Sequence, residues 1–431
     1  MQTSPFHISR RKFLQTSFLG AALPAWYATE CRELRAAEGP ASADDRPGIG
    51  LIGCGGQGRG VANWARSFGR VVAVCDVDQR QLDAAAKQFE VPDSGQVKDF
   101  RRLLGRDDVG VIVNGTPDHW HTLVNLASVK AGKDVFTEKP LTLTVAEGQR
   151  LVRAVREQGT ILQVGSQQRS DRRFRLACEL VRNGRIGKLQ HMLVGLPTGP
   201  REGPFSAQPV PAGLDWDFYL GPTPKIDYNG HNAHWNFRWW YQFSGGQMTD
   251  WGAHHNDIAQ WGNGTDRSGP VEIDGRGLVE MIPGGYDAMA EYEIQFKYAN
   301  GVTMTVTDGK RAPNGVRFVG SEGWIFVSRG NIESDKPEIL EEPLPDNALR
   351  LYRSDNHMGN FFESVRSRQQ PICDAEIGHR SISTAHLGVI SIRLKRPLRW
   401  DPAREVFLGD DEANGWLSRP MRAPYDDRYI G

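Results

Sequence analysis

The sequence has few cysteines and no excess of charge of either sign. Five of its 431 residues are cysteine, and none of them forms a C-x-x-C pair or another zinc-ligand spacing. With so few cysteines, we expect no disulfide framework to hold the fold together. Lys and Arg together number 52, and so do Asp and Glu. Because nucleic-acid-binding surfaces carry a basic excess, we expect no nucleic-acid partner.

The chain also lacks an apolar run long enough to span a membrane. Near the N-terminus, Arg10 and Arg11 precede about a dozen largely apolar residues, whereas a transmembrane helix needs roughly 20. Paired arginines before a short apolar run are typical of a twin-arginine signal peptide, and an ordinary amphipathic helix is the alternative. We expect residues 1–37 to be a signal peptide and linker, with Ala28 and Ala37 as candidate ends. The chain would then be periplasmic, or otherwise exported by this pathway, without stable membrane association after processing.

Two patterns predict the organisation of the chain after this signal. Residues 29–46 are polar and rich in Ala, Glu and Asp, which is typical of a linker. Over residues 46–165, short apolar runs such as VVAVCD and VGVIVN alternate with helix-like segments such as DQRQLDAAAKQFE. Strands that alternate with helices predict a parallel sheet covered by helices on both faces, and hence an α/β domain.

Residues 166–431 show a different pattern. Several strand-like runs follow one another, among them AEYEIQFKYANGVTMTVTD with a tight turn at Asn300–Gly301. Helix-like segments flank these runs, so we expect an α+β domain with a large, mostly antiparallel open sheet. Between Pro197 and Gly246 the chain is rich in Pro, Gly, Trp and His, which predicts a long irregular excursion.

A glycine-rich turn opens the first domain. The stretch GCGGQG matches G-x-G-x-x-G between a predicted strand and a predicted helix, the context in which this pattern binds a dinucleotide. Gly53 permits the tight turn, Gly55 lets the backbone approach the pyrophosphate, and Gly58 lets the helix pack closely on the strand. The first domain is therefore expected to be of the Rossmann type. Its predicted phosphate loop consists of Gly53, Gly55, Gly56, Gln57 and Gly58.

The dinucleotide is predicted to be NAD. Asp76 ends the second strand, 18 residues after Gly58. An acidic side chain there accepts hydrogen bonds from the ribose hydroxyls and repels a 2′-phosphate. Arg80 follows closely enough to leave NADP as the less favoured alternative.

Three further stretches carry polar side chains suited to chemistry on a hydroxyl group. TPDHWH and EKP follow the next two strand-like runs, at the strand ends where this fold binds ligands. GGQMTDWGAHHND places Asp250 and His254 four residues apart, on one helix face, with Asp257 nearby. A histidine beside a hydride acceptor can accept the hydroxyl proton, and a carboxylate can orient it. Lys139 of EKP can hydrogen-bond the same oxygen.

Together these motifs resemble the glucose–fructose oxidoreductase / inositol dehydrogenase / MocA (Gfo/Idh/MocA) family, from about Gly48 to the C-terminus. The resemblance implies a Rossmann domain followed by an α+β domain whose sheet makes oligomer contacts, and thus a homo-oligomer, either a dimer or a tetramer. It also implies that Lys139, with a cis bond to Pro140, is the catalytic lysine. Asp250 and His254 are then the catalytic pair, with His254 as the acid/base.

The resemblance extends to residues around this centre. Asp257 matches a substrate-contacting acid of some members, and Arg169 matches an arginine near the active site. His255 directly follows His254, and the sequence leaves open which of the two faces the substrate. The residues assigned to the cofactor side in TPDHWH and EKP are Thr116, Pro117, His121 and Glu138.

Aromatic and histidine side chains crowd the excursion before this helix. Trp235, Trp239 and Trp240 could stack on the apolar faces of sugar rings, or they could belong to the core or an interface. His231 and His234 have a metal-ligand spacing, but no complete tetrahedral set accompanies them, so we expect no metal.

The signal and the cofactor together suggest a mechanism. NAD is recycled in the cytoplasm and this export route moves folded proteins, so we expect the cofactor to be bound before export and restored within each turnover. We favour an NAD(P)-dependent oxidoreductase that acts on CH–OH groups of a small carbohydrate. One alternative is a glycoside hydrolase that works by transient oxidation, elimination, water addition and re-reduction. Another is a non-catalytic binding protein that keeps the fold.

Overall fold

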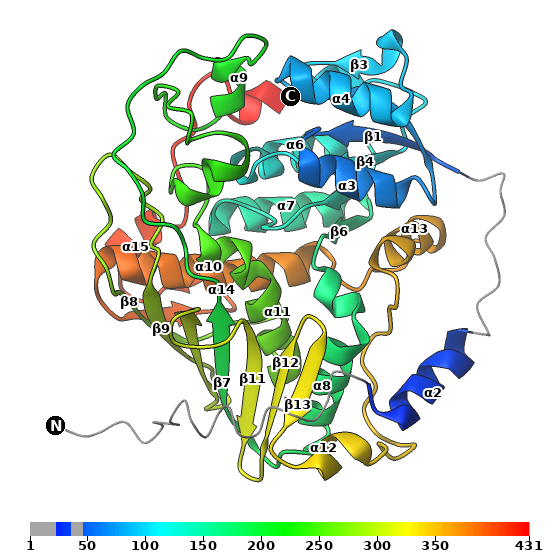
Figure 1. Ribbon diagram of the computed structural model, residues 1–431, viewed down its shortest axis with the longest axis vertical. Coiled ribbons are helices and arrows are strands. Elements are labelled where there is room, and N and C mark those ends of the chain that lie inside the picture. Colours follow the sequence, from blue (N-terminus) through cyan, green and yellow to red (C-terminus); the bar gives the residue numbers. More distant parts are fainter. Residues whose placement is uncertain (1–22, 36–45, 431) are drawn as a thin grey trace.

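Six short strands form a parallel sheet in the first half of the chain. The computed structural model describes residues 23–35 and 46–430. Helices cover both faces of this sheet, so its apolar strands are buried (Figure 1). The order β3-β2-β1-β4-β5-β6 is that of a doubly wound dinucleotide-binding fold. The strands are β1 (Gly48–Ile52), β2 (Arg70–Cys75), β3 (Gln96–Val97), β4 (Val111–Asn114), β5 (Asp134–Thr137) and β6 (Leu162–Val164). The helices are α3 (Gly56–Ala65), α4 (Gln79–Phe89), α5 (Phe100–Leu104), α6 (Asp118–Lys130) and α7 (Val145–Gln158).

Nine strands form a second sheet in the remainder of the chain, in the order β13-β12-β11-β7-β10-β9-β8-β14-β15. Within the described part of this second sheet, β7 and β10 run parallel and the other pairs antiparallel. The predicted parallel and mostly antiparallel sheets are thus confirmed. The strands are β7 (Leu189–Leu196), β8 (Glu272–Gly277), β9 (Tyr292–Lys297), β10 (Thr303–Asp308), β11 (Gly315–Gly320), β12 (Trp324–Ser328), β13 (Asn331–Ser334), β14 (Leu398–Asp401) and β15 (Val406–Phe407).

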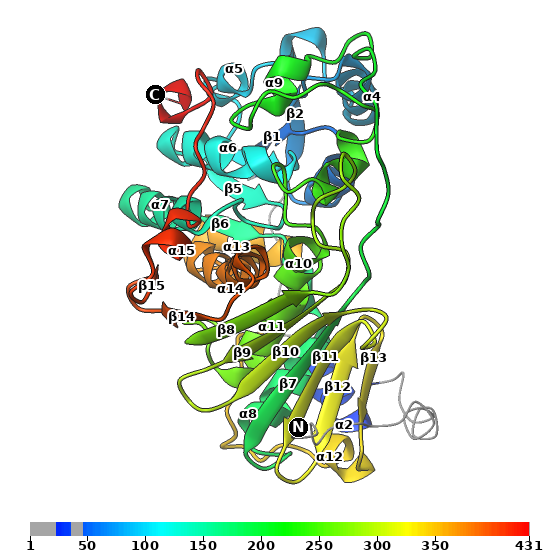
Figure 2. The same cartoon turned by 90° about the vertical axis from the view of Figure 1, so that its left-hand side faces the viewer.

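Helices pack on one face of the second sheet and join it to the first domain. In β9 the buried and exposed residues alternate, as expected of a strand with one face covered. Helices α8, α11 and α14 supply the cover, and α14 also packs on α7 of the first domain (Figure 2). The helices are α8 (Arg172–Arg182), α9 (Trp216–Leu220), α10 (Gln247–Asp250), α11 (Gly252–Asn263), α12 (Pro337–Glu341), α13 (His357–Ser367), α14 (Ala375–Leu394) and α15 (Asp411–Gly415).

A helix near the N-terminus, α2 (Ala25–Arg35), occupies part of the range expected to be a linker. It lies against the second domain near α8 and α12 (Figure 1). Tyr27 is buried and its hydroxyl accepts a hydrogen bond from the Arg175 guanidinium at 2.7 Å. The indole N–H of Trp26 donates to the Leu340 carbonyl at 3.0 Å. The range expected to be a linker therefore contains a docked helix at residues 29–35, which these contacts hold in place. The paired arginines and apolar run of the predicted signal lie outside the described residues.

The excursion after β7 crosses back to the first domain. We call residues 213–240 the strap. The Gln79 N–H donates to the Gly213 carbonyl at 3.0 Å, and the Asp215 N–H donates to the Val77 carbonyl at 3.1 Å. Helix α9 of the strap consequently lies beside the first domain, as both ribbon views show (Figures 1 and 2). The strap forms one wall of the site described below.

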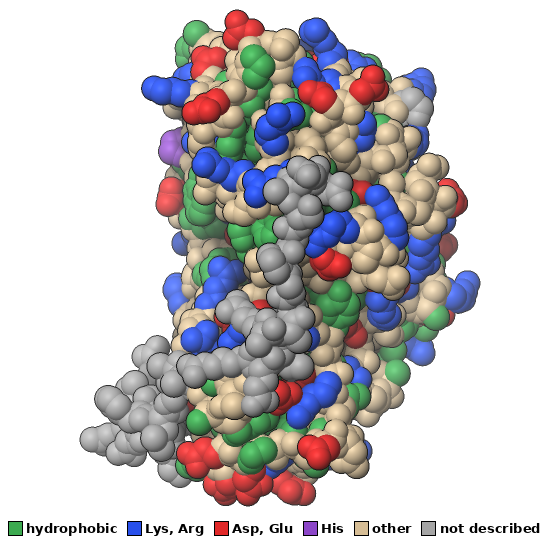
Figure 3. Space-filling view, turned by 90° about the vertical axis from the view of Figure 1, so that its right-hand side faces the viewer, with side chains coloured by type: hydrophobic (Ala, Val, Ile, Leu, Met, Phe, Trp, Pro, Cys, Tyr) green, Lys and Arg blue, Asp and Glu red, His purple; other side chains and the backbone are tan. Residues whose placement is uncertain are grey.

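The surface carries both signs of charge. Lys and Arg side chains are interspersed with Asp and Glu over the face in Figure 3, in keeping with their equal numbers. None of the helices within the described ranges combines the length and apolarity that crossing a bilayer requires.

Candidate active site

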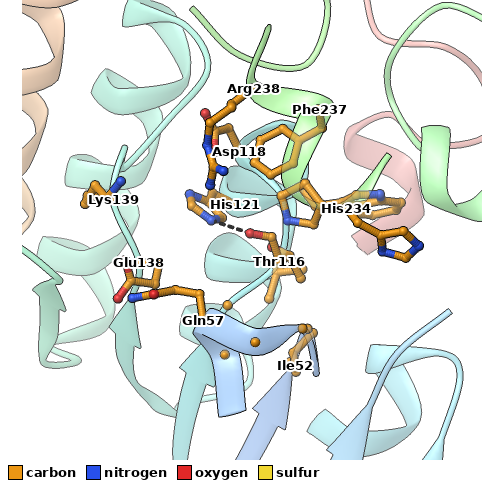
Figure 4. A pocket seen from close by; sticks show the side chains of 18 of the residues that line it. Ile52, Gln57, Thr116, Asp118, His121, Glu138, Lys139, His234, Phe237 and Arg238 are labelled. Atoms are coloured by element: carbon orange, nitrogen blue, oxygen red, sulfur yellow. Dashed lines mark hydrogen bonds between the residues drawn. The ribbon is translucent and has the colours of Figure 1, made fainter. Parts of the chain in front are cut away.

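Residues of both domains line a cavity of about 1060 Å³ at the carboxyl ends of the parallel strands. Parallel strands bring the loops that follow them to one edge of the sheet, which is where this class of fold binds ligands. The second domain contributes α10, α11 and the strap. Figure 4 shows the two sources, with Gln57 and Thr116 on the Rossmann side and Phe237 and Arg238 on the strap.

The glycine loop bounds one part of the cavity. Gly53 has a φ of +87°, and a Cβ on it would lie 2.5 Å from the backbone of Gly115. A Cβ on Gly58 would lie 1.9 Å from the Gly53 carbonyl oxygen, so α3 approaches β1 this closely only without a side chain. By contrast, a Cβ on Gly55 or Gly56 would meet nothing within 4 Å. The N-terminus of α3, whose first N–H groups have no intrahelical acceptors, thus lies beside open space suited to a phosphate.

Asp76 lines the same part of the cavity, directly after β2. Its carboxylate accepts hydrogen bonds from the N–H groups of Cys54 at 2.7 Å and Asp78 at 2.8 Å. Burial raises the pKa of Asp76 to about 6, against the opposing effect of these bonds. Arg80 was the reason for keeping NADP as an alternative cofactor. It forms an ion pair with Asp78 at 3.1 Å and does not line the cavity.

His121 joins two loops at the floor of the cavity. Its Nε2 lies 2.8 Å from the Thr116 carbonyl oxygen, the contact drawn in Figure 4, and its Nδ1 lies 2.6 Å from the Pro140 carbonyl oxygen. The peptide bond between Lys139 and Pro140 is cis. His121 therefore positions the TPDHWH turn against the EKP turn, and Thr116, Pro117 and Glu138 also line the cavity.

Lys139, Asp250 and His254 meet in one part of the cavity, from different elements. The Lys139 ammonium forms an ion pair with Asp250, and the Arg238 Nε lies 3.6 Å from the same carboxylate. Burial opposes ionisation of Asp250, but the charges of Lys139 and Arg238 lower its pKa overall. Burial and the charges of Lys139 and Arg329 lower the pKa of His254 well below its usual value. At neutral pH the site thus holds a neutral imidazole next to an ammonium–carboxylate pair.

The spacing of Asp250 and His254 predicted that they share one helix face. In the structure they lie in two consecutive helices instead. Asp250 is the last residue of α10 and His254 lies in α11, with Trp251 between the two helices. Both side chains nevertheless line the cavity. The Nδ1 of His254 is buried and has no hydrogen-bond partner among the described residues.

Three residues expected to contact substrate lie elsewhere. The His255 ring bonds the Asn314 amide oxygen at 2.9 Å, away from the cavity. Arg169 and Asp257 form a two-pronged ion pair at 2.6 and 2.8 Å, with each side chain 1% exposed. Neither lines the cavity. The physical reason is that a buried guanidinium and a buried carboxylate each need a charged partner, and these two serve one another.

The aromatic residues of the strap divide between the cavity and the packing around it. Trp235 lines the cavity and is 71% exposed. Trp239 and Trp240 do not line it, and the Trp240 indole donates to the His231 carbonyl at 2.7 Å. His234 lines the cavity, with its Nε2 3.3 Å from the Asp78 carboxylate. Across the described ranges, no three metal-ligating side chains gather at one point.

The sequence reasoning assigned no role to three residues that line the cavity. Asp118, within TPDHWH, accepts a hydrogen bond from the Ser244 hydroxyl at 2.5 Å, and burial raises its pKa to about 7. Gln168 is 3% exposed, and neither of its amide atoms has a partner within the described ranges. Arg329 comes from the turn between β12 and β13, where no motif marks it. Asp118 could have been found from its motif, whereas Gln168 and Arg329 could not.

Comparison with known families gives two matches that cover both domains. Residues 48–166 match the Gfo/Idh/MocA model described as an oxidoreductase family NAD-binding Rossmann fold. Residues 201–427 match the model described as the C-terminal alpha/beta domain of the same oxidoreductase family. The second match alone spans more than half of the chain.

Individual proteins resemble the chain more distantly. A myo-inositol 2-dehydrogenase of Thermotoga maritima is 24% identical over 365 residues, which cover 81% of this chain and 98% of that protein. A glycosyl hydrolase family 109 protein of Shewanella pealeana is 29% identical over 206 residues, 43% of this chain and 45% of that protein.

Two solved structures share the fold. A levoglucosan dehydrogenase complexed with NADH and levoglucosan has a TM-score of 0.62 at 17% identity, covering 82% of this chain and 99% of that one. An aldose-aldose oxidoreductase from Caulobacter crescentus has a TM-score of 0.61 at 18% identity, with the same coverage.

Proposed function

The chain belongs to the Gfo/Idh/MocA oxidoreductase family, and from this premise we propose that it is an exported enzyme that transfers hydride between a carbohydrate or cyclitol hydroxyl and a tightly held NAD. The observation that carries the proposal is the meeting of Lys139, Asp250 and His254 in the cavity that the glycine loop also lines. Inositol and sugar dehydrogenases among the relatives support the substrate class.

The residues of the glycine loop fit a dinucleotide. Gly55 and Gly56 present backbone without obstruction, and the N-terminus of α3 offers N–H groups to a pyrophosphate. Asp76 offers carboxylate oxygens for ribose hydroxyls, and Arg80 is paired outside the cavity, which favours NAD over NADP. When bound, the nicotinamide supplies an acceptor for the two electrons that leave the sugar carbon as hydride.

The side chains of the chain handle the proton and the oxygen. His254 lines the cavity and is neutral at neutral pH, so its imidazole can accept the hydroxyl proton as the carbon is oxidised. The Lys139 ammonium can hydrogen-bond the same oxygen and stabilise the charge that develops on it. Asp250 holds that ammonium in place. In the reverse direction His254 returns the proton to a carbonyl oxygen, so one site serves both halves of an internally recycled reaction.

The strap supports retention of the cofactor. Phe218, Tyr219 and His234 of the strap line the cavity opposite the Rossmann loops. Residues of the first domain hold this segment, since the Trp120 indole donates to the Tyr219 carbonyl at 3.0 Å and His234 lies against Asp78. A cofactor under this segment would leave only after these contacts break. Such retention suits a protein that is loaded in the cytoplasm and then exported.

Glycoside hydrolysis through transient oxidation is a second candidate, and Asp118 favours it. That route needs a second group to move a proton during elimination and water addition. Asp118 lines the same cavity as His254, and its pKa of about 7 lets it hold or release a proton near neutral pH. We rank it behind net oxidoreduction because Asp118 is already bonded to Ser244.

The test begins with the purified protein and no added cofactor. Denatured protein should release about one NAD per chain and no NADP, because the strap retains what is bound. Carbohydrates and cyclitols should then reduce this NAD, which absorbance at 340 nm reports. An empty protein that binds NAD weakly contradicts a retained cofactor. Release of an aryl alcohol from aryl glycosides, without an added acceptor, would replace net oxidoreduction by hydrolysis.

Export has its own test. Replacing Arg10 and Arg11 together by lysine should keep the chain in the cytoplasm, as cell fractionation would reveal, because the pathway reads the arginine pair. Replacing Arg66 and Arg70 in the first domain by lysine is the control and should leave export unchanged. Equal distribution of both variants would contradict the signal.

A further inference from the structure

The distribution of charge in the cavity points to a feature of the substrate. Lys139, Arg238 and Arg329 all line it. One carboxylate, that of Asp250, pairs with Lys139 and lies 3.6 Å from Arg238. Among the described residues, no carboxylate lies within 4.0 Å of the Arg329 guanidinium. Two of these cations therefore lie close to the Asp250 carboxylate, whereas Arg329 has no ion-pair partner among the described residues.

The other acids of this part of the cavity are engaged elsewhere. Asp171 caps α8 by accepting the Arg173 N–H at 2.8 Å, and it pairs with the Arg173 guanidinium at 3.5 Å. Glu138 is the exception, since burial raises its pKa and its buried Oε1 has no hydrogen-bond partner among the described residues. Burial likewise raises the pKa of Asp118, which accepts the Ser244 hydroxyl. Among the described residues, none of these three acids forms an ion pair with Arg238 or Arg329, so both arginines can accept a further anion.

Both guanidinium groups lie over tryptophan rings. The Arg238 guanidinium lies 4.0 Å from the Trp235 ring centroid, and the Arg329 guanidinium lies 4.6 Å from that of Trp251. Stacking occupies one face of a guanidinium and leaves its edge N–H groups available to an acceptor. The Arg238 Nε is in fact buried without a hydrogen-bond partner, and so is the amide of Gln168. The residues that line the cavity thus include buried polar atoms that have no partner within the described ranges.

We propose that the substrate is an acidic carbohydrate, whose anionic group is bound by Arg329 and Arg238. The edge of a guanidinium donates two parallel hydrogen bonds to a carboxylate or to a phosphate alike. These arginines would therefore recognise the anionic group that uronic acids and sugar phosphates share. The exposed ring of Trp235 offers an apolar face to the sugar beside that group. This inference rests on the proposed function, because it names the substrate class of the same site.

The experiment compares sugars that differ at one carbon. Glucose, glucuronate and glucose 6-phosphate share a ring and differ at C6, and the galactose series provides a second set. Binding to the NAD-loaded protein is measured by quenching of tryptophan fluorescence, and reduction of the bound NAD is measured separately at 340 nm. We expect at least one acid to bind about tenfold or more tightly than its neutral partner, with an affinity that falls as salt is added. The comparison between carboxylate and phosphate identifies the anion.

Substitutions at Arg329 test whether this residue binds the anionic group of the substrate. Arg329→Gln should weaken binding of the acid about tenfold and leave the neutral sugar within about twofold, while Arg329→Lys keeps the charge and should lose less. Arg276→Gln is the matched control, because Arg276 is an exposed arginine on β8 that pairs with Asp274 outside the cavity. The Arg276→Gln variant should bind both the acid and the neutral sugar with unchanged affinity. Thermal unfolding of each variant checks that the fold is intact.

The outcomes separate this inference from the proposed function. Two results would overturn the inference. In one, neutral sugars bind as tightly as the acids in both series. In the other, the Arg329→Gln variant binds acid and neutral sugars with unchanged preference. Neutral sugars that also reduce NAD would leave the proposed function standing. Tight, Arg329-dependent binding of an acid without any reduction of NAD supports the inference and contradicts the hydride transfer.

Discussion

At the scale of single residues, the site depends on how a few charges are shared. Asp250 pairs with Lys139 and lies close to Arg238, while burial and the charges of Lys139 and Arg329 keep His254 neutral. A neutral base and a cation can therefore coexist in a buried space. This arrangement suits removal of a proton from a hydroxyl group.

Replacing Lys139 by alanine should slow reduction of the bound NAD by about 10²- to 10⁴-fold, because the ammonium that polarises the substrate oxygen is lost. The amount of NAD released on denaturation should stay the same, since the glycine loop is unaltered. Lys297→Ala is a control, because Lys297 lies on β9 in an exposed pair with Glu272. An unchanged rate in the Lys139 variant would remove this residue from the mechanism.

The pH dependence of sugar oxidation should reflect His254. Oxidation needs the unprotonated imidazole, and burial with the charges of Lys139 and Arg329 keeps the pKa well below 6.5. The rate should therefore persist as the pH falls through 6.5 and decline only at lower pH. Arg329→Gln removes one of these charges, so the pKa should rise and the decline should move to higher pH. Profiles of kcat/KM measured on both proteins check this, and a decline centred at pH 6.5 or above in the parent would contradict it.

At the scale of elements, the contact between β1 and α3 forms the cofactor loop. A Cβ on Gly58 would lie 1.9 Å from the Gly53 carbonyl oxygen, and both atoms belong to backbone that cannot move independently. Gly58→Ala should therefore lower the free energy of unfolding by about 1–3 kcal/mol and leave the purified protein without NAD. Gly60→Ala, in the same helix, is the matched control, because its Cβ would meet nothing within 4 Å. The Gly60→Ala variant should retain NAD, and its free energy of unfolding should rise by up to about 1 kcal/mol. Urea unfolding and cofactor content measure both effects, and equal behaviour of the two variants would contradict the packing argument.

Helix α2 should be part of the folded protein rather than a disposable linker. A chain that begins at residue 36 exposes the site of Tyr27 and leaves the Arg175 guanidinium with fewer partners. It should unfold at lower denaturant concentration than a chain that begins at residue 23. Tyr27→Phe isolates the hydroxyl and should cost about 1–3 kcal/mol. Equal stability of the two chains would mean that α2 contributes nothing.

The same contacts bear on processing of the expected signal. A cut after Ala28 or Ala37 would remove part or all of α2, including buried Tyr27. We therefore expect the exported chain to begin no later than Ala25, and the mass of the intact protein measures this directly. A mature chain that begins after Ala37 would contradict this expectation.

At the scale of the whole molecule, Arg422 near the C-terminus fastens the strap over the cavity. The Arg422 guanidinium donates to the Asp217 carboxylate at 2.7 Å and to the Gly221 carbonyl at 3.1 Å. Arg422→Ala should loosen the strap and raise the rate of NAD release, about tenfold or more, in a dilution experiment that follows free NAD. Arg428→Ala is the control, since Arg428 pairs only with neighbouring Asp426 in the described part of the tail. Identical release from both variants would show that the strap does not retain the cofactor.

Much of this architecture follows from local pattern. The alternation of strands and helices predicted the parallel sheet, and the Asn-Gly turn predicted the pairing of β9 with β10. The glycine loop, Lys139, Asp250 and His254 could be placed in one cavity from the sequence because they follow strand ends or share a short segment. These features depend on backbone geometry over a few residues, which the sequence encodes directly.

The tertiary structure decided what no local pattern specifies. It turned His254 toward the cavity and His255 toward Asn314, and it paired Arg169 with Asp257 across 88 residues of chain. It also docked α2 on the second domain and brought Arg329 to the cavity from a distant hairpin. Each depends on which buried charges and apolar faces meet when separate elements pack. The sequence by itself therefore determined the fold and the grouping of Lys139, Asp250 and His254 in one cavity, while packing decided which neighbours surround them.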